Sequence, residues 1–368
     1  MDPVTHVAVG ALLSQLLPGP SPVWSAVAGM SITLLPDCDY FLIFFDQLAF
    51  IRHHRAFSHS LTALPLFALL AAGVAWVLGG PRWFQPIFFL GLAVLASHLL
   101  VLDLATSYGT QLLFPFSRKR FALDWLFIID PYLTVLLLAG AVAAPIPGWG
   151  HRAGLAFLAA AGGYLLLCGC YHRQALVLAR QVFHPSTANP GPLSAPSHPR
   201  KAGSPAAGGL RMAALPQPYS CRRWLLLASN GREVAQALVQ LPYLAPLGLW
   251  RPPAPPAVIR LPLDCRAPAE VYPAPQDLRL QVFSGLPMPE LDLDPEAREI
   301  RDRYLEFARF PLLHQVQVLE DGLALEWLDL RFSVPGRVFP FALRMRLDPQ
   351  GRVRQWRLGP CDQGLNTA

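Results

Sequence analysis

The stretch GLAVLASHLLVLD, residues 91–103, decides the fold that this sequence predicts. It is an apolar run of the kind that crosses a bilayer as a helix, yet it contains His98 and ends at Asp103. An ionisable side chain inside a membrane segment costs about 2.5–3.5 kcal/mol on insertion scales, so it needs a partner or a function. The stretch therefore predicts a polar site within a helical membrane domain.

Composition separates this region from the rest of the 368-residue chain, which is 53% hydrophobic and 15% charged, with a mean hydropathy of +0.35. A soluble domain usually carries about 25% charged residues. The shortfall lies in residues 1–180, whereas residues 210–368 have a soluble composition. We therefore predict an all-α polytopic membrane domain of about 5–6 helices over residues 1–180. A Pro/Gly/Ser-rich linker over 185–218 and a soluble C-terminal α+β or mostly-β domain over 219–368 follow it.

Six apolar segments support the membrane domain, at roughly 4–17, 23–45, 61–78, 84–105, 126–145 and 152–170. Alternating them across a bilayer brings the histidines and aspartates to one face. Most basic residues of the short connections fall on that face, namely Arg52, Arg55, Arg118, Lys119, Arg120, Arg173 and Arg180. The opposite face holds Arg82 and Arg152. Because Lys and Arg concentrate in cytoplasmic loops, we expect this face and the C-terminal domain to be cytoplasmic.

The C-terminal region alternates short β-like runs with turn residues. Two runs flank residues 348–351, Asp-Pro-Gln-Gly, which is a hairpin turn pattern. Asp294 before Pro295 predicts the start of a helix near 295–309. The six cysteines form no CxxC pair, so we expect free thiols in a reducing compartment.

The candidate site consists of ionisable residues that gather at the predicted cytoplasmic face: His6, Asp37, Asp39, His53, His54, His59, His98, Asp103, Asp124 and Asp130. Imidazole and carboxylate groups are the usual ligands of hydrolytic zinc, manganese or magnesium sites. Such a metal activates water and polarises a phosphoryl or carbonyl oxygen. The set is large enough for one or two metal ions.

Each residue also has a structural explanation when it is taken alone. His6 fits a packed helix position, Asp37 and Asp39 fit a helix-end turn after Pro36, and Asp130 fits the start of a helix at Pro131. The basic run 118–120 fits a topology anchor. His98 is the hardest to explain without a polar partner, and the argument for a site rests on convergence. The motifs HExxH, GxSxG and GxxxxGK[ST] are absent, which disfavours zincin proteases, α/β-hydrolases and P-loop enzymes.

The order of these motifs resembles a bacterial inner-membrane metal-dependent hydrolase family, whose founding member is a damage-inducible membrane protein. The likeness covers about residues 1–180 and rests on THVAVG, LLPDCD, HHRAFSHS, SHLLVLDLATSYGTQLLFPFS and ALDWLFIIDP. DLRF near Asp329 resembles the tail domain of that family, and the motif order is remotely similar to zinc phospholipase C and single-strand nucleases. The resemblance implies that the metal ligands or their supporters are His6, Asp37, Asp39, His54, His59, His98 and Asp103.

One departure from that family concerns the pair His98 and Asp103. In the family the acid follows the histidine by four residues, one helical turn, whereas here it follows by five. On an ideal α-helix a five-residue offset separates two side chains by about 140°. Either a local bulge restores the facing, or Asp103 is not a ligand.

We therefore expect a membrane-bound metal-dependent hydrolase in the bacterial cytoplasmic membrane, holding zinc, or alternatively manganese or magnesium. Its expected substrate is a phosphoester in a phospholipid or a lipid-linked molecule, because a site at the headgroup level meets lipid phosphates first. Arg55 and the run 118–120 would clamp the phosphate, and Asp39 or Asp130 would act as general base.

Two alternatives from other classes stay open: an ion or small-molecule carrier, and a non-catalytic membrane anchor for a soluble interaction domain. A carrier usually has an internal repeat, and none is seen in this sequence. An anchor would leave the His/Asp face unexplained. No nucleic acid partner is expected, because the formal charge of +6 is scattered along the chain. The oligomeric state is left open.

Overall fold

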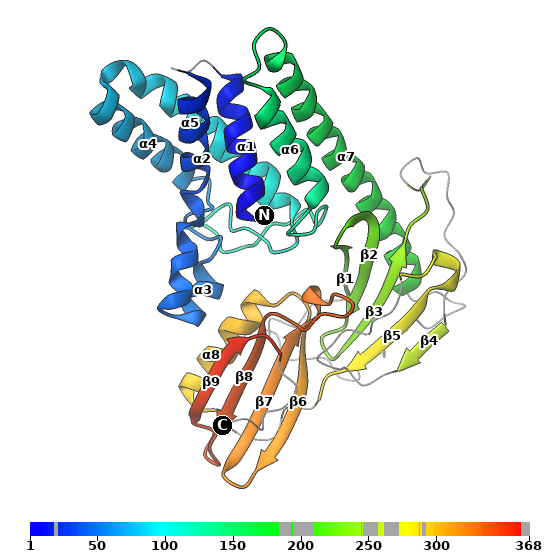
Figure 1. Cartoon of the computed structure of the whole chain (residues 1–368). Coiled ribbons are helices and arrows are strands. Elements are labelled where there is room, and N and C mark those ends of the chain that lie inside the picture. Colours follow the sequence, from blue (N-terminus) through cyan, green and yellow to red (C-terminus); the bar gives the residue numbers. More distant parts are fainter. Residues whose placement is uncertain are drawn as a thin grey trace. The chain divides into compact units, whose positions relative to one another are not determined.

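The computed structural model describes the whole chain except residues 18–20, 184–192, 194–209, 244, 246–256, 261–271, 287, 289–291 and 362–368. The chain forms two compact units, Met1–Cys170 and Tyr171–Ala368. The first is helical and the second is built mainly from two β-sheets (Figure 1). The division falls inside a long helix, about ten residues before the boundary that composition predicts.

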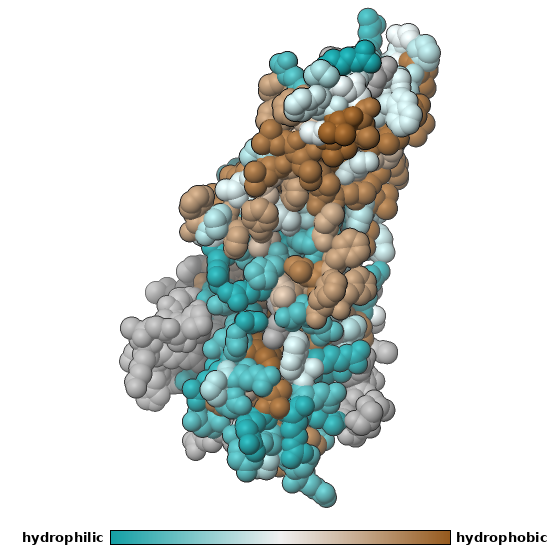
Figure 2. Space-filling model, turned by 90° about the vertical axis from the view of Figure 1, so that its left-hand side faces the viewer, coloured by the Kyte–Doolittle hydropathy of each residue, from teal (hydrophilic) through white to brown (hydrophobic). Residues whose placement is uncertain are grey.

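The six apolar segments of the sequence correspond to helices or broken helices. The elements of the helical unit are α1 (Pro3–Leu16), α2 (Pro22–Thr33), η1 (Pro36–Phe44), α3 (Gln47–His53), α4 (Ala63–Gly79), η2 (Pro81–Trp83), α5 (Phe84–Ala96), η3 (Ser97–Asp103), α6 (Pro131–Ala143) and α7 (Gly150–Phe183). Figure 2 shows apolar side chains over much of the visible face of this unit. The visible described surface of the sheet unit is mostly hydrophilic.

Two helices of the described chain are long and apolar enough to cross a membrane, Pro81–Asp103 and Gly150–Phe183. A third span results if α2 and η1, bent by 50°, are counted as one. The helices α1, α4 and α6 are apolar but shorter. The helical unit thus has two or three candidate spans, and a bundle of five or six crossings stays a prediction.

Close contact between α1 and α2 sets the geometry around the polar residues. A Cβ atom on Gly10 would lie 2.5 Å from the carbonyl oxygen of Gly29, and one on Gly29 would lie 2.2 Å from that of Gly10. Only glycine permits this approach, which is typical of small residues between apolar helices. The contact brings Thr33, at the end of α2, beside the first turns of α1. The chain then turns into η1 at Pro36.

The second unit confirms a mostly-β domain. A five-stranded sheet has the order β1-β2-β3-β5-β4, in which all neighbours are antiparallel except β4 and β5. A four-stranded antiparallel sheet has the order β6-β7-β8-β9. The strands are β1 (Arg211–Gln217), β2 (Ser220–Ser229), β3 (Glu233–Gln240), β4 (Ala257–Arg260), β5 (Arg279–Ser284), β6 (Pro311–Leu319), β7 (Gly322–Asp329), β8 (Ala342–Leu347) and β9 (Val353–Gly359).

Local sequence signals in this unit are largely confirmed. Asp294 caps helix α8 (Pro295–Phe307), and the predicted turn at 348–351 joins β8 to β9. The last turns of α7 pack on the five-stranded sheet, with Leu178 and Phe183 in a core that includes Trp224. Burial of these apolar faces, rather than strand propensity alone, holds the sheet against the helix.

Two expectations about this region are corrected. The predicted linker ends earlier than residue 218, because residues 211–217 form β1; most of its remaining length lies outside the described residues. Cys361 is disulfide-bonded, contrary to the expectation of free thiols, whereas the cysteines at 38, 168, 170 and 221 are free.

Candidate metal centre

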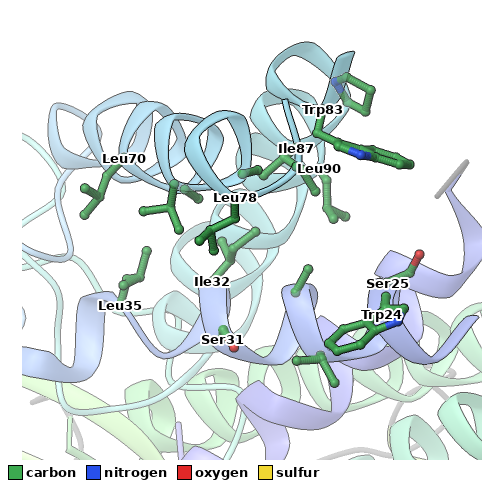
Figure 3. Close-up of a pocket in the computed structure, with 17 residues that line it drawn as sticks. Trp24, Ser25, Ser31, Ile32, Leu35, Leu70, Leu78, Trp83, Ile87 and Leu90 are labelled. Carbon is green, nitrogen blue, oxygen red and sulfur yellow. The ribbon is translucent and has the colours of Figure 1, made fainter. Parts of the chain in front are cut away.

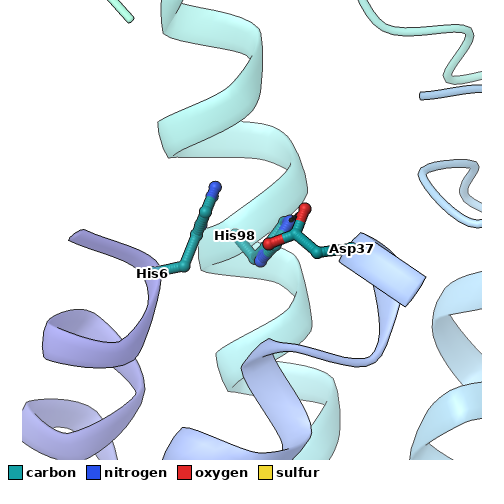
Figure 4. Close-up of side chains that lie close together, drawn as sticks. All are labelled: His6, Asp37 and His98. Carbon is teal, nitrogen blue, oxygen red and sulfur yellow. Dashed lines mark ion pairs between the residues drawn. The ribbon is translucent and has the colours of Figure 1, made fainter. Parts of the chain in front are cut away.

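Four separate segments of the helical unit bring five predicted ligands together. His6 comes from α1, Asp37 from η1, His59 from the loop before α4, and both His98 and Asp103 from η3. The ligand atoms of His6, Asp37 and His98 lie within 4.8 Å of one another. So do those of His59, His98 and Asp103. Figure 4 shows the first group converging from three elements.

The five-residue offset between His98 and Asp103 is explained by the helix type. Ser97–Asp103 is a π-helix that continues α5. Hydrogen bonds in a π-helix join residues five apart, so side chains at that spacing fall on the same face. Nε2 of His98 accordingly lies 3.2 Å from Oδ2 of Asp103. The local bulge that the sequence left as one of two alternatives is present, and Asp103 joins the candidate ligands.

The carboxylate of Asp103 is fully buried, and its two oxygens have different partners. Oδ1 lies 3.0 Å from the Arg55 guanidinium and 3.3 Å from Nε2 of His6, and it also contacts the Met1 amino group. Oδ2 faces Nε2 of His59 at 3.3 Å and Nε2 of His98 at 3.2 Å. One oxygen is therefore held by cations, while the other points toward the imidazole nitrogens.

Several of these converging atoms are buried without a hydrogen-bond partner among the described residues. They include both ring nitrogens of His6, Oδ2 of Asp37 and Oδ2 of Asp103. An unsatisfied buried polar group costs about 1–3 kcal/mol, and more if it is charged. One or two divalent cations in these two groups would bind the carboxylate oxygens and one ring nitrogen of His6, because nitrogen and carboxylate oxygen donors suit zinc and manganese. The donor set therefore fits a resident metal ion.

Asp39 and His54, also predicted as ligands, lie beside this group rather than within it. Oδ2 of Asp39 is 3.3 Å from Nδ1 of His59, the ring nitrogen that faces away from Asp103. Asp39 also accepts hydrogen bonds from Nδ1 of His54 at 2.9 Å, the Arg55 backbone N–H and Ser58 Oγ. A carboxylate on the second nitrogen of a ligating histidine fixes its orientation and basicity. Burial lowers the pKa of His54 despite its bond to Asp39, which favours a neutral ring.

Two of the four residues of the predicted phosphate clamp, Arg55 and Arg120, are engaged within the protein. Arg55 sits in the left-handed region with a φ of 57° and is buried, and its guanidinium contacts Asp103 and, at 2.9 Å, Thr106 Oγ1. Arg120 donates to backbone carbonyls, including that of Ile51 at 2.9 Å. Arg118 and Lys119 are exposed. Arg55 therefore neutralises and positions Asp103, and Arg120 ties two loops together.

Asp130 is placed as a helix cap. It is the N-cap of α6 and accepts hydrogen bonds from the Leu133 backbone N–H at 3.0 Å and from the Tyr164 hydroxyl at 2.9 Å. These contacts match the structural alternative that the sequence left open. The other two members of the wider set lie apart from the two ligand groups: His53 ends α3 and is exposed, and Asp124 occupies a positive-φ position in the loop before α6.

Sequence reasoning missed Thr33, whose hydroxyl lies 3.4 Å from Nδ1 of His98. A threonine in an apolar helix is common, so nothing in the sequence marks this one as a partner of a histidine.

The sequence also could not predict which side of the cluster is exposed. The Asp37 side chain is 20% exposed, whereas those of His59, His98 and Asp103 are 0% exposed. Asp37 therefore marks the open side of the cluster.

Comparisons with known proteins agree with the membrane reading and state no chemistry. Residues 1–175, which contain the whole cluster, match the model of a family described as YdjM inner membrane protein. The chain is 28% identical over 179 residues to the uncharacterized protein YfhP of Bacillus subtilis strain 168, covering 46% of this chain and 53% of that protein. The chain thus spans about half the length of this curated relative. No solved structure matches the chain.

Proposed function

We propose that this chain is a membrane-bound metal-dependent hydrolase that cleaves a phosphoester in a lipid or lipid-linked substrate. The supporting observation is the convergence of His6, Asp37, His59, His98 and Asp103 inside an apolar helical unit. Several of their carboxylate and imidazole atoms have no hydrogen-bond partner among the described residues. Maintaining such a cluster is costly unless a ligand compensates for it. Perturbed and unsatisfied polar groups gathered in one place are a mark of functional sites.

In this proposal the five residues hold one or two divalent ions, zinc before manganese or magnesium. The bound metal would supply Lewis acidity that polarises a phosphoryl oxygen and activates water. Asp39 orients His59 through its Nδ1 atom, and Arg55 holds Oδ1 of Asp103 so that Oδ2 faces the imidazoles. The contact of Asp39 with His59 and that of Arg55 with Asp103 both lower the reorganisation needed when the site binds its ligand.

Asp37 is the carboxylate we assign to proton transfer, in place of Asp39 or Asp130. Its Oδ1 lies 3.4 Å from Nε2 of His59, while Oδ2 has no hydrogen-bond partner among the described residues. Part of its side chain is exposed, whereas the other four side chains are fully buried, so the approach to the cluster lies on the side of Asp37. The carboxylate of Asp37 would accept the proton of the attacking water.

The lipid substrate class is supported by the surroundings of Asp37. The same η1 segment carries exposed Tyr40, Phe41 and Phe44. Tyrosine is enriched where a membrane meets water, at the level of the lipid headgroups, and exposed phenylalanines beside it would contact the adjoining lipid tails. Because Lys and Arg are in excess in the connections on this face, we propose that it is the cytoplasmic face. We also propose that the C-terminal domain is cytoplasmic.

A phosphate-release assay in lipid nanodiscs tests this function. Purified protein would be supplied with zinc, manganese or magnesium and offered phosphatidic acid, phosphatidylglycerol or a polyprenyl phosphate. We expect release of inorganic phosphate or phosphoglycerol that stops with a chelator and falls at least 100-fold in Asp37→Asn, but not in Cys38→Ser. Metal-loaded protein that releases neither product from these substrates would contradict the hydrolase proposal and favour the carrier or the anchor.

A further inference from the structure

A large apolar groove lies between α2, α4 and α5, outside the His/Asp cluster. Its volume is about 750 Å³, within the usual range of about 300–1,000 Å³ for small-molecule sites. Residues from the three helices and η2 line it, among them Trp24, Ile32, Leu35, Leu78, Trp83 and Leu90 (Figure 3). Nothing in the proposed chemistry uses this groove.

Residues that line the groove are close in sequence to residues of the candidate metal centre. Ile32 precedes Thr33, the residue whose hydroxyl contacts His98, and Leu35 lies two residues before Asp37. On the other wall, Leu90 lies eight residues before His98, about 12 Å along a helix. Both walls therefore lead from the groove to ligand-bearing segments.

The opposite end of the groove carries two tryptophans, Trp24 and Trp83. Trp24 is 67% exposed, and tryptophan is enriched where a bilayer meets water. From Trp24 to Leu35 the chain advances eleven residues, about 16 Å of helix. That length is close to half of the about 30 Å hydrocarbon core of a bilayer.

The wall contributed by α4 is apolar and open. Leu70 is 55% exposed, Val74 is 50% exposed and Leu78 is 81% exposed. Exposed aliphatic side chains on an apolar helix of a membrane domain would meet lipid tails rather than water. A groove with these walls favours a hydrocarbon chain over a polar ligand.

We infer that this groove binds the hydrocarbon chain of a phosphate-bearing lipid, oriented so that the headgroup reaches Asp37 and the metal centre. The placement of the phosphate rests on the proposed function, whereas the groove's affinity for a lipid chain does not. Binding a lipid chain in a fixed groove would hold the phosphoester beside the metal ligands, which reduces the entropy lost in reaching the transition state.

Photolabelling tests the inference with a phosphatidic acid that carries a diazirine in its acyl chain. Full-length protein would be labelled in nanodiscs, and the modified peptides identified by mass spectrometry. The inference predicts labels concentrated on the groove-lining residues within 24–35 and 70–90, such as Leu35, Leu70 and Leu78, and few on the face that carries Val77. Ala75→Trp, which fills the groove, should lower this labelling at least tenfold. Val77→Trp, on the same helix but 84% exposed and outside the groove lining, should leave it unchanged.

Folding of the variants is checked by circular dichroism and by monodisperse elution in detergent, which both variants should share with the unmodified protein. If Ala75→Trp fails this check, Ser31→Phe fills the groove from α2 and takes its place. Equal labelling of the groove and of the face that carries Val77, or labelling that neither filled variant reduces, would overturn the inference.

A second readout separates this inference from the hydrolase proposal. Hydrolysis of a short-chain, water-soluble phosphatidic acid should survive groove filling, while hydrolysis of the dioleoyl form should fall at least tenfold. Groove-specific labelling without hydrolysis of either substrate would leave the lipid groove standing and contradict the proposed reaction. Hydrolysis of both forms to the same extent in Ala75→Trp would contradict the groove and leave the reaction standing.

Discussion

Two buried aspartates, one in each unit, are handled in opposite ways by their surroundings. Asp329 in the sheet unit is 1% exposed and Asp103 in the helical unit is 0% exposed. Asp329 accepts hydrogen bonds from the backbone N–H groups of Arg309, Phe310 and Arg331, and its Oδ2 pairs with the Arg331 side chain at 3.1 Å. Each of its oxygens has at least two donors.

Asp103 has one oxygen that is paired and another that faces imidazole nitrogens with no hydrogen bond from the described residues. The two residues have the same charge and the same burial, so neither property distinguishes them. The difference is whether the carboxylate is already satisfied by the fold. A satisfied buried carboxylate is typical of a structural role, whereas an unsatisfied one among other donors is a candidate for ligand binding.

The largest effect is expected for Asp103→Asn. This change removes a candidate ligand and leaves Arg55 as a buried cation without its carboxylate, and breaking a buried pair costs about 3–5 kcal/mol. We expect metal content at background and a lower free energy of unfolding, measured by elemental analysis and chemical denaturation in detergent. The variant Asp103→Asn/Arg55→Gln should regain part of the stability but no metal. Metal retained in Asp103→Asn would contradict its role as a ligand.

A smaller effect is expected for Asp39→Asn. The amide no longer provides the negative charge beside Nδ1 of His59, and loss of such an outer contact weakens metal binding by about 10–100-fold. Competition with a chromophoric chelator would measure the zinc affinity. Asp46→Asn changes an exposed acid in the following turn and serves as the control. Complete loss of metal would instead make Asp39 a ligand, as the sequence first suggested.

Asp329→Asn should affect stability alone. The substitution weakens the hydrogen bonds to Arg309, Phe310 and Arg331, and leaving a buried donor unpaired costs about 1–3 kcal/mol. We expect earlier unfolding of the sheet unit, followed by hydrogen exchange, with the metal content unchanged. Loss of metal in this variant would break the contrast between the two aspartates.

The smallest effect is expected for Asp130→Ala. Removing an N-cap aspartate costs about 0.5–2 kcal/mol of helix stability. Metal affinity and phosphoester turnover should stay within twofold of the unmodified protein. A turnover loss of 100-fold at unchanged stability would restore Asp130 as a catalytic base.

The sequence predicted much of the cluster because ionisable residues in apolar segments are costly and therefore stand out. It could not decide whether Asp103 faces His98, because periodicity assumes an ideal α-helix and the residue types at 97–103 do not mark the π-helical turn found there. It also could not separate Asp39 from Asp37. The two aspartates are two residues apart on one turn, yet Asp37 contacts Nε2 of His59 and Asp39 contacts Nδ1.

In the sheet unit the sequence missed two strands for identifiable reasons. Residues 233–240, EVAQALVQ, are rich in helix formers, yet this segment is the central strand between β2 and β5, where burial outweighs propensity. Residues 211–217 contain Pro216 and follow a Pro-rich segment. Proline is tolerated there because β1 is an edge strand and its register shifts between Pro216 and Gln217.

Elemental analysis of the detergent-purified protein tests the central claim most directly. Wild type would be compared with His59→Ala/His98→Ala, and with His151→Ala as an exposed histidine outside the cluster. The account predicts near-stoichiometric zinc or manganese in wild type and in His151→Ala, and background levels in the double variant. Equal metal content in all three proteins, or no metal in wild type after reconstitution, would contradict the metal centre.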